Sequence, residues 1–302
     1  MESDRARGVL LGLACGDALG RPVEFKSASA ISTEHGRLDE MVEEGTWNQP
    51  AGTITDDTEQ ALCIARSLVE QQTFDPADIA RRFVAWYDTE PFDIGGMTAR
   101  SLSRLKHGDA WDEAGRHVWE QSREGQNAGN GSVMRCPPLA VPYASDWDQL
   151  VAVSRQSSQI THADPRCTYG CAILNLTIAG LLENTDAPLQ AALDDVDSDA
   201  PDELVTALEP VARGETPSPL ETSGYVVYSL QTALHDSLVA DSAEEAMVTA
   251  VNRSGDTDTI GAIAGAVAGA RFGASQLPER WLSAINEVRE IKSLASQLTS
   301  LS

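Results

Sequence analysis

Residues 257–273, TDTIGAIAGAVAGARFG, constrain the fold of this chain more than any other stretch. Small side chains recur at helical spacing here, at Gly261, Ala262, Gly265, Ala266 and Gly269. A helix with such a face can approach its neighbours more closely than larger side chains permit. The segment is far shorter than the roughly 20 apolar residues needed to span a bilayer. We therefore expect a buried helix that packs tightly against other helices.

Most of the remaining chain shows the same helical periodicity of apolar residues. In residues 56–72, one stripe carries Ala61, Leu62, Ala65, Leu68 and Val69. Alternating patterns long enough for β-strands are missing. The sequence therefore predicts an all-α protein of ten or more helices. Further helices are expected at residues 5–20, 75–90, 94–108, 147–161, 165–184, 187–196, 223–238, 242–255 and 278–298.

The charge of the chain disfavours two classes of partner. Asp and Glu total 46 against 22 Lys and Arg, which gives a net charge of -24. Such a surface repels nucleic-acid phosphates and anionic lipids, so neither is an expected partner. The scarcity of lysine and the excess of aspartate also suggest a halophilic host, whose salty cytoplasm screens the self-repulsion.

The cysteines indicate a reducing compartment. Their number is odd, five, and they are scattered without a zinc-binding pattern. The N-terminus has no secretory pattern. We therefore expect buried free thiols and a cytoplasmic location.

Two acidic motifs stand at expected helix starts about 200 residues apart, TDD at 55–57 and DTDT at 256–259. Capping alone explains either motif, because threonine is a good N-cap and the helix dipole favours aspartate in the first turn. Together they look more like one oxygen-only site for hard cations such as Mg²⁺ or Mn²⁺. Four aspartates balance two divalent ions, a charge that capping does not require. The candidate metal ligands are Thr55, Asp56, Asp57, Asp256, Asp258 and Thr259.

Two other aspartate-rich motifs fit the sequence less well. An EF-hand loop that starts at Asp256 needs a glutamate at its twelfth position, where Val267 stands. DTDTI also resembles the DxDxT motif of haloacid-dehalogenase-like phosphatases, which follows a buried strand. Here VNRSG precedes the motif, at the end of a helix. A metal-dependent phosphatase is therefore the weaker alternative.

Two loops hold further candidates. Glu24 lies in a turn after the first helix, where a lone glutamate is usually solvated, and it matters only if it reaches the acidic cluster. Residues 129–132, GNGS, lead into an expected short helix that ends at Pro137–Pro138. Glycine-rich backbone at a helix start offers N–H groups to phosphate, although Asn-Gly turns are common.

Two ring side chains are ambiguous. His162, just before Asp164-Pro165, is more often a structural hydrogen-bonding group than a ligand contact. Tyr225 is either a core aromatic or a flat surface on which a base stacks.

Seven motifs, in order over residues 5–275, resemble the ADP-ribosylglycohydrolase family. The resemblance implies an all-α fold, a compact orthogonal helical bundle with a two-metal centre that holds two Mg²⁺ or Mn²⁺. It also implies an enzyme that removes ADP-ribose from an acceptor, either a modified protein or a small ADP-ribose derivative. The motifs are GVLLGLACGDALGRPVEF, GTITDDTEQAL, FDIGGMTARSL, GNGSVMRCPPLAV, THADP, SGYVVYSLQTAL and NRSGDTDTIGAIAGAVAGARFG.

The resemblance assigns roles to individual residues. The six metal-ligand candidates fall on the family's ligands, and Glu24 falls on its essential glutamate. His162 would lie near the substrate, Tyr225 near the adenosine, and Asp93 where some members have an acidic residue close to the substrate. The family's phosphate-binding segment corresponds to Gly129, Asn130, Gly131 and Ser132.

The resemblance also bears on domain organisation. Residues 193–220 are acidic and proline-rich, the only stretch typical of a linker or surface excursion. Because metal ligands at 55–57 and 256–259 must meet, we expect one domain over residues 1–302, with that stretch peripheral and the protein monomeric. The main alternative is a non-catalytic, ADP-ribose-binding or crystallin-like relative, against which the intact ligand positions and Glu24 weigh.

Overall fold

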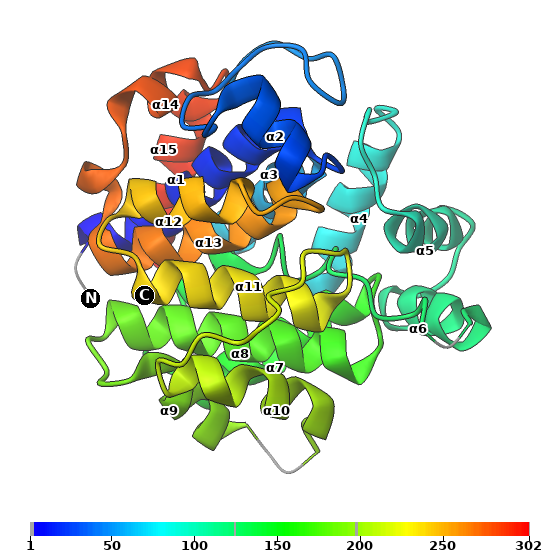
Figure 1. The fold of residues 1–302 in the computed structure, drawn as a ribbon. Coiled ribbons are helices and arrows are strands. Elements are labelled where there is room, and N and C mark those ends of the chain that lie inside the picture. The colour runs from blue at the N-terminus through cyan, green and yellow to red at the C-terminus, as the bar shows by residue number, and fades with distance from the viewer. Residues whose placement is uncertain (1–2, 124, 197–198, 302) are drawn as a thin grey trace.

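The computed structural model describes residues 3–123, 125–196 and 199–301, which are organised almost wholly as helices (Figure 1). Apart from two isolated bridges, these residues contain no β-structure, which confirms the all-α prediction. The helices are α1 (Ser3–Gly20), η1 (Arg21–Val23), α2 (Ala28–His35), α3 (Asp56–Gln71), α4 (Pro76–Tyr87), α5 (Gly96–Lys106), α6 (Trp111–Gln121), η2 (Pro137–Ala140), α7 (Trp147–Gln159), α8 (Pro165–Leu182), α9 (Pro188–Asp195), α10 (Asp202–Ala212), α11 (Val226–Val239), α12 (Ala243–Val251), α13 (Thr257–Phe272), η3 (Ala274–Gln276), α14 (Glu279–Ala284) and α15 (Val288–Leu298).

Helices α1 and α13 form the centre of the molecule although they come from opposite ends of the chain (Figure 1). They run antiparallel in backbone contact. A Cβ atom added at Gly12 would lie 2.1 Å from the carbonyl oxygen of Gly265, and one added at Gly265 would lie 2.0 Å from that of Gly12. Gly8 meets Gly269 and Gly16 meets Gly261 in the same way. The small face of residues 257–272 thus packs on a matching glycine face of α1.

The surrounding helices bury both members of this pair. Helix α8 is buried over nearly its whole length, as expected of a helix that is apolar all round. Helices α11, α12 and α15 pack against the α1–α13 pair, whereas α5 and α6 stand to one side of the body (Figure 1). No helix among the described residues combines the length and apolar character needed to cross a bilayer. All five cysteines are buried and free, as expected.

The structure corrects several details of the sequence prediction. Residues 193–220, taken as a linker or surface excursion, include α10, whose Leu204, Leu208 and Val211 are buried at helical spacing. Residues 197–198 of that stretch lie outside the described residues. Helices α2 and α6 were not predicted, and the single helix expected at 278–298 is divided into α14 and α15 around the extended Ile285. The short helix expected between residues 132 and 137 does not form, and residues 131–135 make turns instead. Pro137 begins η2, because proline suits the first turn of a helix.

Candidate metal and substrate site

A cavity of about 630 Å³ opens where the end of α1, the start of α3 and the start of α13 meet. Its wall also includes residues around 93–98, 125–131 and 223–225, together with Trp47, Met134 and His162. Among the described residues that line it there is no lysine or arginine. Six carboxylates line it, those of Glu24, Asp56, Asp57, Asp93, Asp256 and Asp258.

The start of α3 is held by a buried carboxylate of α1. Asp17 is fully buried and accepts hydrogen bonds from the backbone N–H groups of Thr55 and Thr58 and from both threonine hydroxyls. Thr55 is also the N-cap of α3, as the capping interpretation predicted, and its hydroxyl accepts from the N–H of Asp57. Asp17 therefore fixes the helix turn that presents Asp56 and Asp57 to the cavity.

The start of α13 departs from simple capping. Asp256 is the N-cap residue, but its side chain makes no capping hydrogen bond. It accepts instead from the side-chain amide of Asn130 at 2.8 Å. Asp258, two residues further, is buried, and the hydroxyl of the neighbouring Thr259 points at the sulfur of Met134. The two acidic motifs thus line one cavity, and capping does not account for Asp256.

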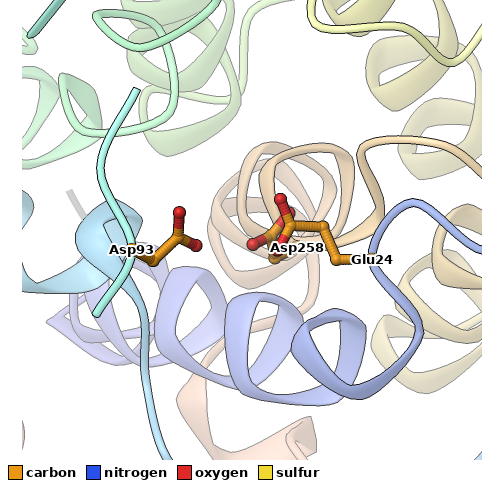
Figure 2. Close-up of side chains that lie close together, drawn as sticks. All are labelled: Glu24, Asp93 and Asp258. Carbon is orange, nitrogen blue, oxygen red and sulfur yellow. The ribbon is translucent and has the colours of Figure 1, made fainter. Parts of the chain in front are cut away.

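Glu24 and Asp93 belong to the same acidic cluster. Oxygen atoms of Glu24, Asp93 and Asp258 lie within 4.8 Å of one another, and Figure 2 shows the three side chains, drawn from separate segments of the chain, around one space. In the sequence, Glu24 lies outside the two acidic motifs, and Asp93 was predicted to lie close to the substrate. In the structure Glu24 is only 4% exposed, so it is not the solvated turn residue that a lone glutamate usually is.

Burial and mutual repulsion oppose the ionisation of these carboxyl groups. Burial, followed by the charge of Asp93, raises the pKa of Glu24 to about 8. Burial, with the charge of Asp17 next, raises the pKa of Asp93 to about 7. Burial likewise raises the pKa values of Asp57 and Asp258 well above their usual range. A protein stabilises such a cluster either by protonation or by binding cations.

The donor set fits hard divalent cations. The acidic cluster offers oxygen ligands, mainly carboxylates, which suit Mg²⁺ or Mn²⁺ better than softer metals. Buried polar atoms are normally paired, yet Oδ1 of Asp57 is buried without a hydrogen-bond partner in the described structure. An orphaned carboxylate oxygen in a cavity that lacks basic side chains is a position where a cation can bind.

A glycine-rich wall stands beside the acidic cluster. The backbone of Asn130 donates to the carbonyl of Gly224, and that of Val226 donates to the carbonyl of Ala128, so the two segments run side by side. At Gly131, an added Cβ would lie 2.9 Å from the ring of His162. Glycine is needed there because the His162 ring packs directly against the backbone and leaves no room for a side chain. Among the described residues, the N–H of Gly131 has no hydrogen-bond partner.

A buried chain of hydrogen bonds links the acidic cluster with this wall. The amide of Gln60 donates to Asp56 and its carbonyl oxygen accepts from Arg135. Arg135, fully buried, also donates to the hydroxyl of Thr161, which bonds Nδ1 of His162 at 2.7 Å. Burial, with the nearby Arg135 charge, lowers the pKa of His162 to about 3, so the ring is neutral at the cavity surface.

Tyr225 lies at the edge of the core and also at the cavity. It is partly buried and lines the cavity, and its ring meets that of Tyr228 edge-on at 5.0 Å. Its hydroxyl donates to Glu203 and accepts from Arg166. The ring is therefore held at the cavity wall by surface polar groups.

Two predicted site residues do not line the cavity. The hydroxyl of Thr55 is used within the α3 start, and the side chain of Ser132 accepts a hydrogen bond from Ser158 on the far side of the glycine segment. Sequence reasoning also overlooked Asp17 and Trp47. The cluster GDALG around Asp17 was visible, but only the structure shows its carboxylate facing α3.

Comparison with known proteins agrees with this geometry. A model of the ADP-ribosylglycohydrolase family matches residues 2–302. The chain belongs to the ADP-ribosylglycohydrolase family. It is 34% identical over 300 residues to the ADP-ribosyl-[dinitrogen reductase] glycohydrolase of Rhodospirillum rubrum, covering 99% of this chain and 96% of the relative. It is 32% identical to the ADP-ribosylarginine hydrolase Tri1 of Pseudomonas putida (strain GB-1), covering 98% of this chain and 78% of that protein.

The fold agrees with the family as well. A solved structure described as an ADP-ribosylglycohydrolase-related protein complex superposes with a TM-score of 0.82 at 33% identity, over 99% of this chain and 98% of the other. Family membership identifies the protein as a glycosidase-type hydrolase that acts on glycosidic bonds of ADP-ribose. It confirms the family and the fold that the motifs indicated.

Proposed function

We propose that the chain hydrolyses the bond between the anomeric carbon of ADP-ribose and an acceptor side chain in a reaction that requires two Mg²⁺ or Mn²⁺ ions. The observation that carries the metal requirement is the cavity with six carboxylates and no lysine or arginine among its described lining residues. The negative charge of these carboxylates would repel the pyrophosphate of ADP-ribose, so bound cations are needed to neutralise it. Asp56, Asp57, Asp256, Asp258 and Thr259 are the proposed ligands at the cavity, with Glu24 and Asp93 next to them. Thr55, the sixth proposed ligand, would reach a cation only from the buried side of the α3 start, where its hydroxyl contacts Asp57.

The other cavity residues are proposed to bind the remaining parts of the substrate. Bound cations supply orientation of the ribose hydroxyls and a more acidic water. The glycine wall offers backbone N–H groups, that of Gly131 among them, to the pyrophosphate. His162, neutral and buried against this wall, keeps it in shape, and Tyr225 offers its ring to the adenine.

Glu24 is the proposed proton-transfer group. Cleavage at an anomeric carbon passes through an oxocarbenium-like state, in which a leaving group gains a proton and a water loses one. A carboxyl group whose pKa lies near neutrality serves either transfer efficiently. The indole N–H of Trp47 donates to one oxygen of Glu24, and the carboxyl groups of Asp93 and Asp258 lie close to the same side chain.

The relatives support an arginine acceptor. One is named an ADP-ribosylarginine hydrolase, and a second protein of that name, from Serratia proteamaculans (strain 568), is 28% identical. The carboxylates come from residues 24, 56–57, 93 and 256–258, which supports one catalytic domain over residues 1–302. The five buried free thiols fit a reducing, cytoplasmic setting.

The metal requirement is tested by removal and return. Dialysis of the protein against EDTA should abolish release of ADP-ribose from an ADP-ribosylated arginine peptide, and Mg²⁺ or Mn²⁺ should restore it. Asp57→Asn should weaken metal binding in calorimetric titration while the helical circular dichroism stays at the parental level. Full activity of the metal-free protein would overturn the proposal.

A further inference from the structure

Phe25, directly after the proposed catalytic Glu24, is the third residue of a turn that the N–H of Lys26 closes by donating to the carbonyl of Val23. Its φ of 62° lies in the left-handed region, which is unfavourable for a bulky side chain. Its N–H donates to the carbonyl of Gly255 at 2.7 Å, and the N–H of Gly255 returns a hydrogen bond to Lys26. The ring is nevertheless 67% exposed and lines the cavity, so it regains little by burial. An exposed aromatic ring in a strained position beside a catalytic group points to ligand contact.

Trp47 extends the same wall of the cavity. Its indole N–H donates to the carboxylate of Glu24, and its ring lies 5.9 Å from that of Phe92. The loop that carries Trp47 is anchored by Arg21, a fully buried side chain that donates to three backbone carbonyls, those of Val42, Glu44 and Pro50. The aromatic wall is therefore built on a fixed support.

The position of Glu24 decides which part of the substrate meets this wall. Glu24 must reach the glycosidic bond, so the group attached to the anomeric carbon lies beside it. Phe25 is its chain neighbour and Trp47 its hydrogen-bond donor. The glycine wall and Tyr225 come from other segments, and no hydrogen bond or ring contact among the described residues joins them to Phe25 or Trp47. With Glu24 at the glycosidic bond, the acceptor is expected to face the aromatic rings of Phe25 and Trp47.

The chemistry of the wall selects a flat cation. Aromatic faces attract a guanidinium, which stacks on them and keeps its charge, and nearby carboxylates add to this attraction. Lys26, the residue after Phe25, is paired with Glu34 at 2.6 Å. A hydroxyl acceptor such as serine offers neither the flat surface nor the charge.

We propose that Phe25 and Trp47 form an acceptor subsite that favours arginine-linked over serine-linked ADP-ribose. The inference rests on the proposed function, because it takes Glu24 as the group that acts on the glycosidic bond. It adds two specificity-determining residues that lie outside the acidic motifs.

The test compares Phe25→Asn, which removes the ring but suits a left-handed backbone, with Phe25→Tyr, which keeps the ring. In the presence of Mg²⁺, kcat/KM is measured on an arginine-linked and a serine-linked ADP-ribosyl peptide, and the Kd of free ADP-ribose by calorimetry. Phe25→Asn should lower kcat/KM for the arginine-linked peptide about 5–30-fold, the effect of losing a cation–π contact. The serine-linked kcat/KM and the Kd should change less than about twofold, and Phe25→Tyr should match the parent.

The outcomes separate this inference from the proposed function. An equal loss on both peptides, or a weaker Kd for ADP-ribose by the same factor, would assign Phe25 to the adenosine or to loop structure and overturn the subsite. A parent enzyme that prefers the serine-linked peptide would overturn it too, while the hydrolase activity stands. A parent that cleaves neither peptide with Mg²⁺ or Mn²⁺ present would instead refute the proposed function.

Discussion

The floor and the mouth of the cavity are built in different ways. The floor rests on α1 and α13, packed backbone to backbone, and on the buried Asp17 that fixes the start of α3. The mouth is made of loops, with Phe25 exposed and Asp93 and Trp47 only partly buried. A floor of packed helices fixes charges to within a fraction of an ångström, whereas loops change readily without loss of the core. The difference suggests that the floor determines the reaction and the mouth selects the acceptor.

The largest expected effect comes from the floor. Gly265→Ala places a Cβ about 2.0 Å from the carbonyl of Gly12, so the two central helices must separate. We expect a loss of about 1–3 kcal/mol or more in the free energy of unfolding, because backbone atoms cannot yield as side chains do. Urea denaturation followed by circular dichroism measures it.

Gly96→Ala is the matched control, because a Cβ there meets nothing within 4 Å. It should unfold at the urea concentration of the parent or slightly above it. If Gly265→Ala were as stable as this control, the α1–α13 packing would tolerate change, and the floor would be no more rigid than the loops of the mouth.

Glu24→Gln acts at the boundary between floor and mouth. The amide keeps the size of the side chain and removes its titrating proton, so single turnover should fall roughly 10²–10⁴-fold. The affinity for ADP-ribose and the urea midpoint should stay near parental values. Rapid-quench measurement of ADP-ribose release gives the rate. Turnover at the parental rate would leave the proton transfers to the aspartates of the floor.

The smallest effect concerns charge in the metal-free protein. Folding raises the pKa of Glu24 from 4.5 to about 8 and that of Asp93 from 3.8 to about 7. A raised carboxyl pKa favours the protonated native state, so this stability is fully present below the unfolded pKa values and is lost as the pH rises to 8. In EDTA, the melting temperature should therefore fall between pH 5 and 8.

Mg²⁺ should raise the melting temperature more at pH 8 than at pH 5.5, by roughly 2–4 °C for each kcal/mol of difference. Differential scanning fluorimetry at both pH values measures the two shifts. The double substitution Glu24→Gln, Asp93→Asn should reduce their difference. Equal shifts in the parent at both pH values would mean that these carboxyl groups ionise freely without metal.

The elements whose local pattern is strong were predictable from the sequence. The helical face of residues 56–72 and the small-residue face of residues 257–272 are local features, and both were interpreted correctly. Helix α10 was missed because acidic and proline-rich composition obscured the helical spacing of Leu204, Leu208 and Val211. The partner of α13 was also missed, although glycines at positions 8, 12, 16 and 20 show the same four-residue spacing.

In the site, too, the local features were predictable and the contacts between distant segments were not. The acidic motifs at the starts of α3 and α13 were visible because each is contiguous in sequence. The place of Asp93 in the cluster, the support from Asp17 and the bond from Trp47 to Glu24 depend on contacts between distant segments. No local rule predicts a contact that the tertiary fold creates.

The pairing of α1 with α13 also governs how the protein is made. The first helix leaves the ribosome with a bare glycine face, and its partner follows only after about 240 further residues have been synthesised. Until then, the nascent chain holds an exposed apolar helix without its central contact, and such species are prone to aggregation. The contact that builds the cavity floor joins α1 to α13, segments separated by most of the chain, so it forms late in synthesis. Truncated chains that end before α13 should accordingly need chaperones and never acquire the acidic cavity.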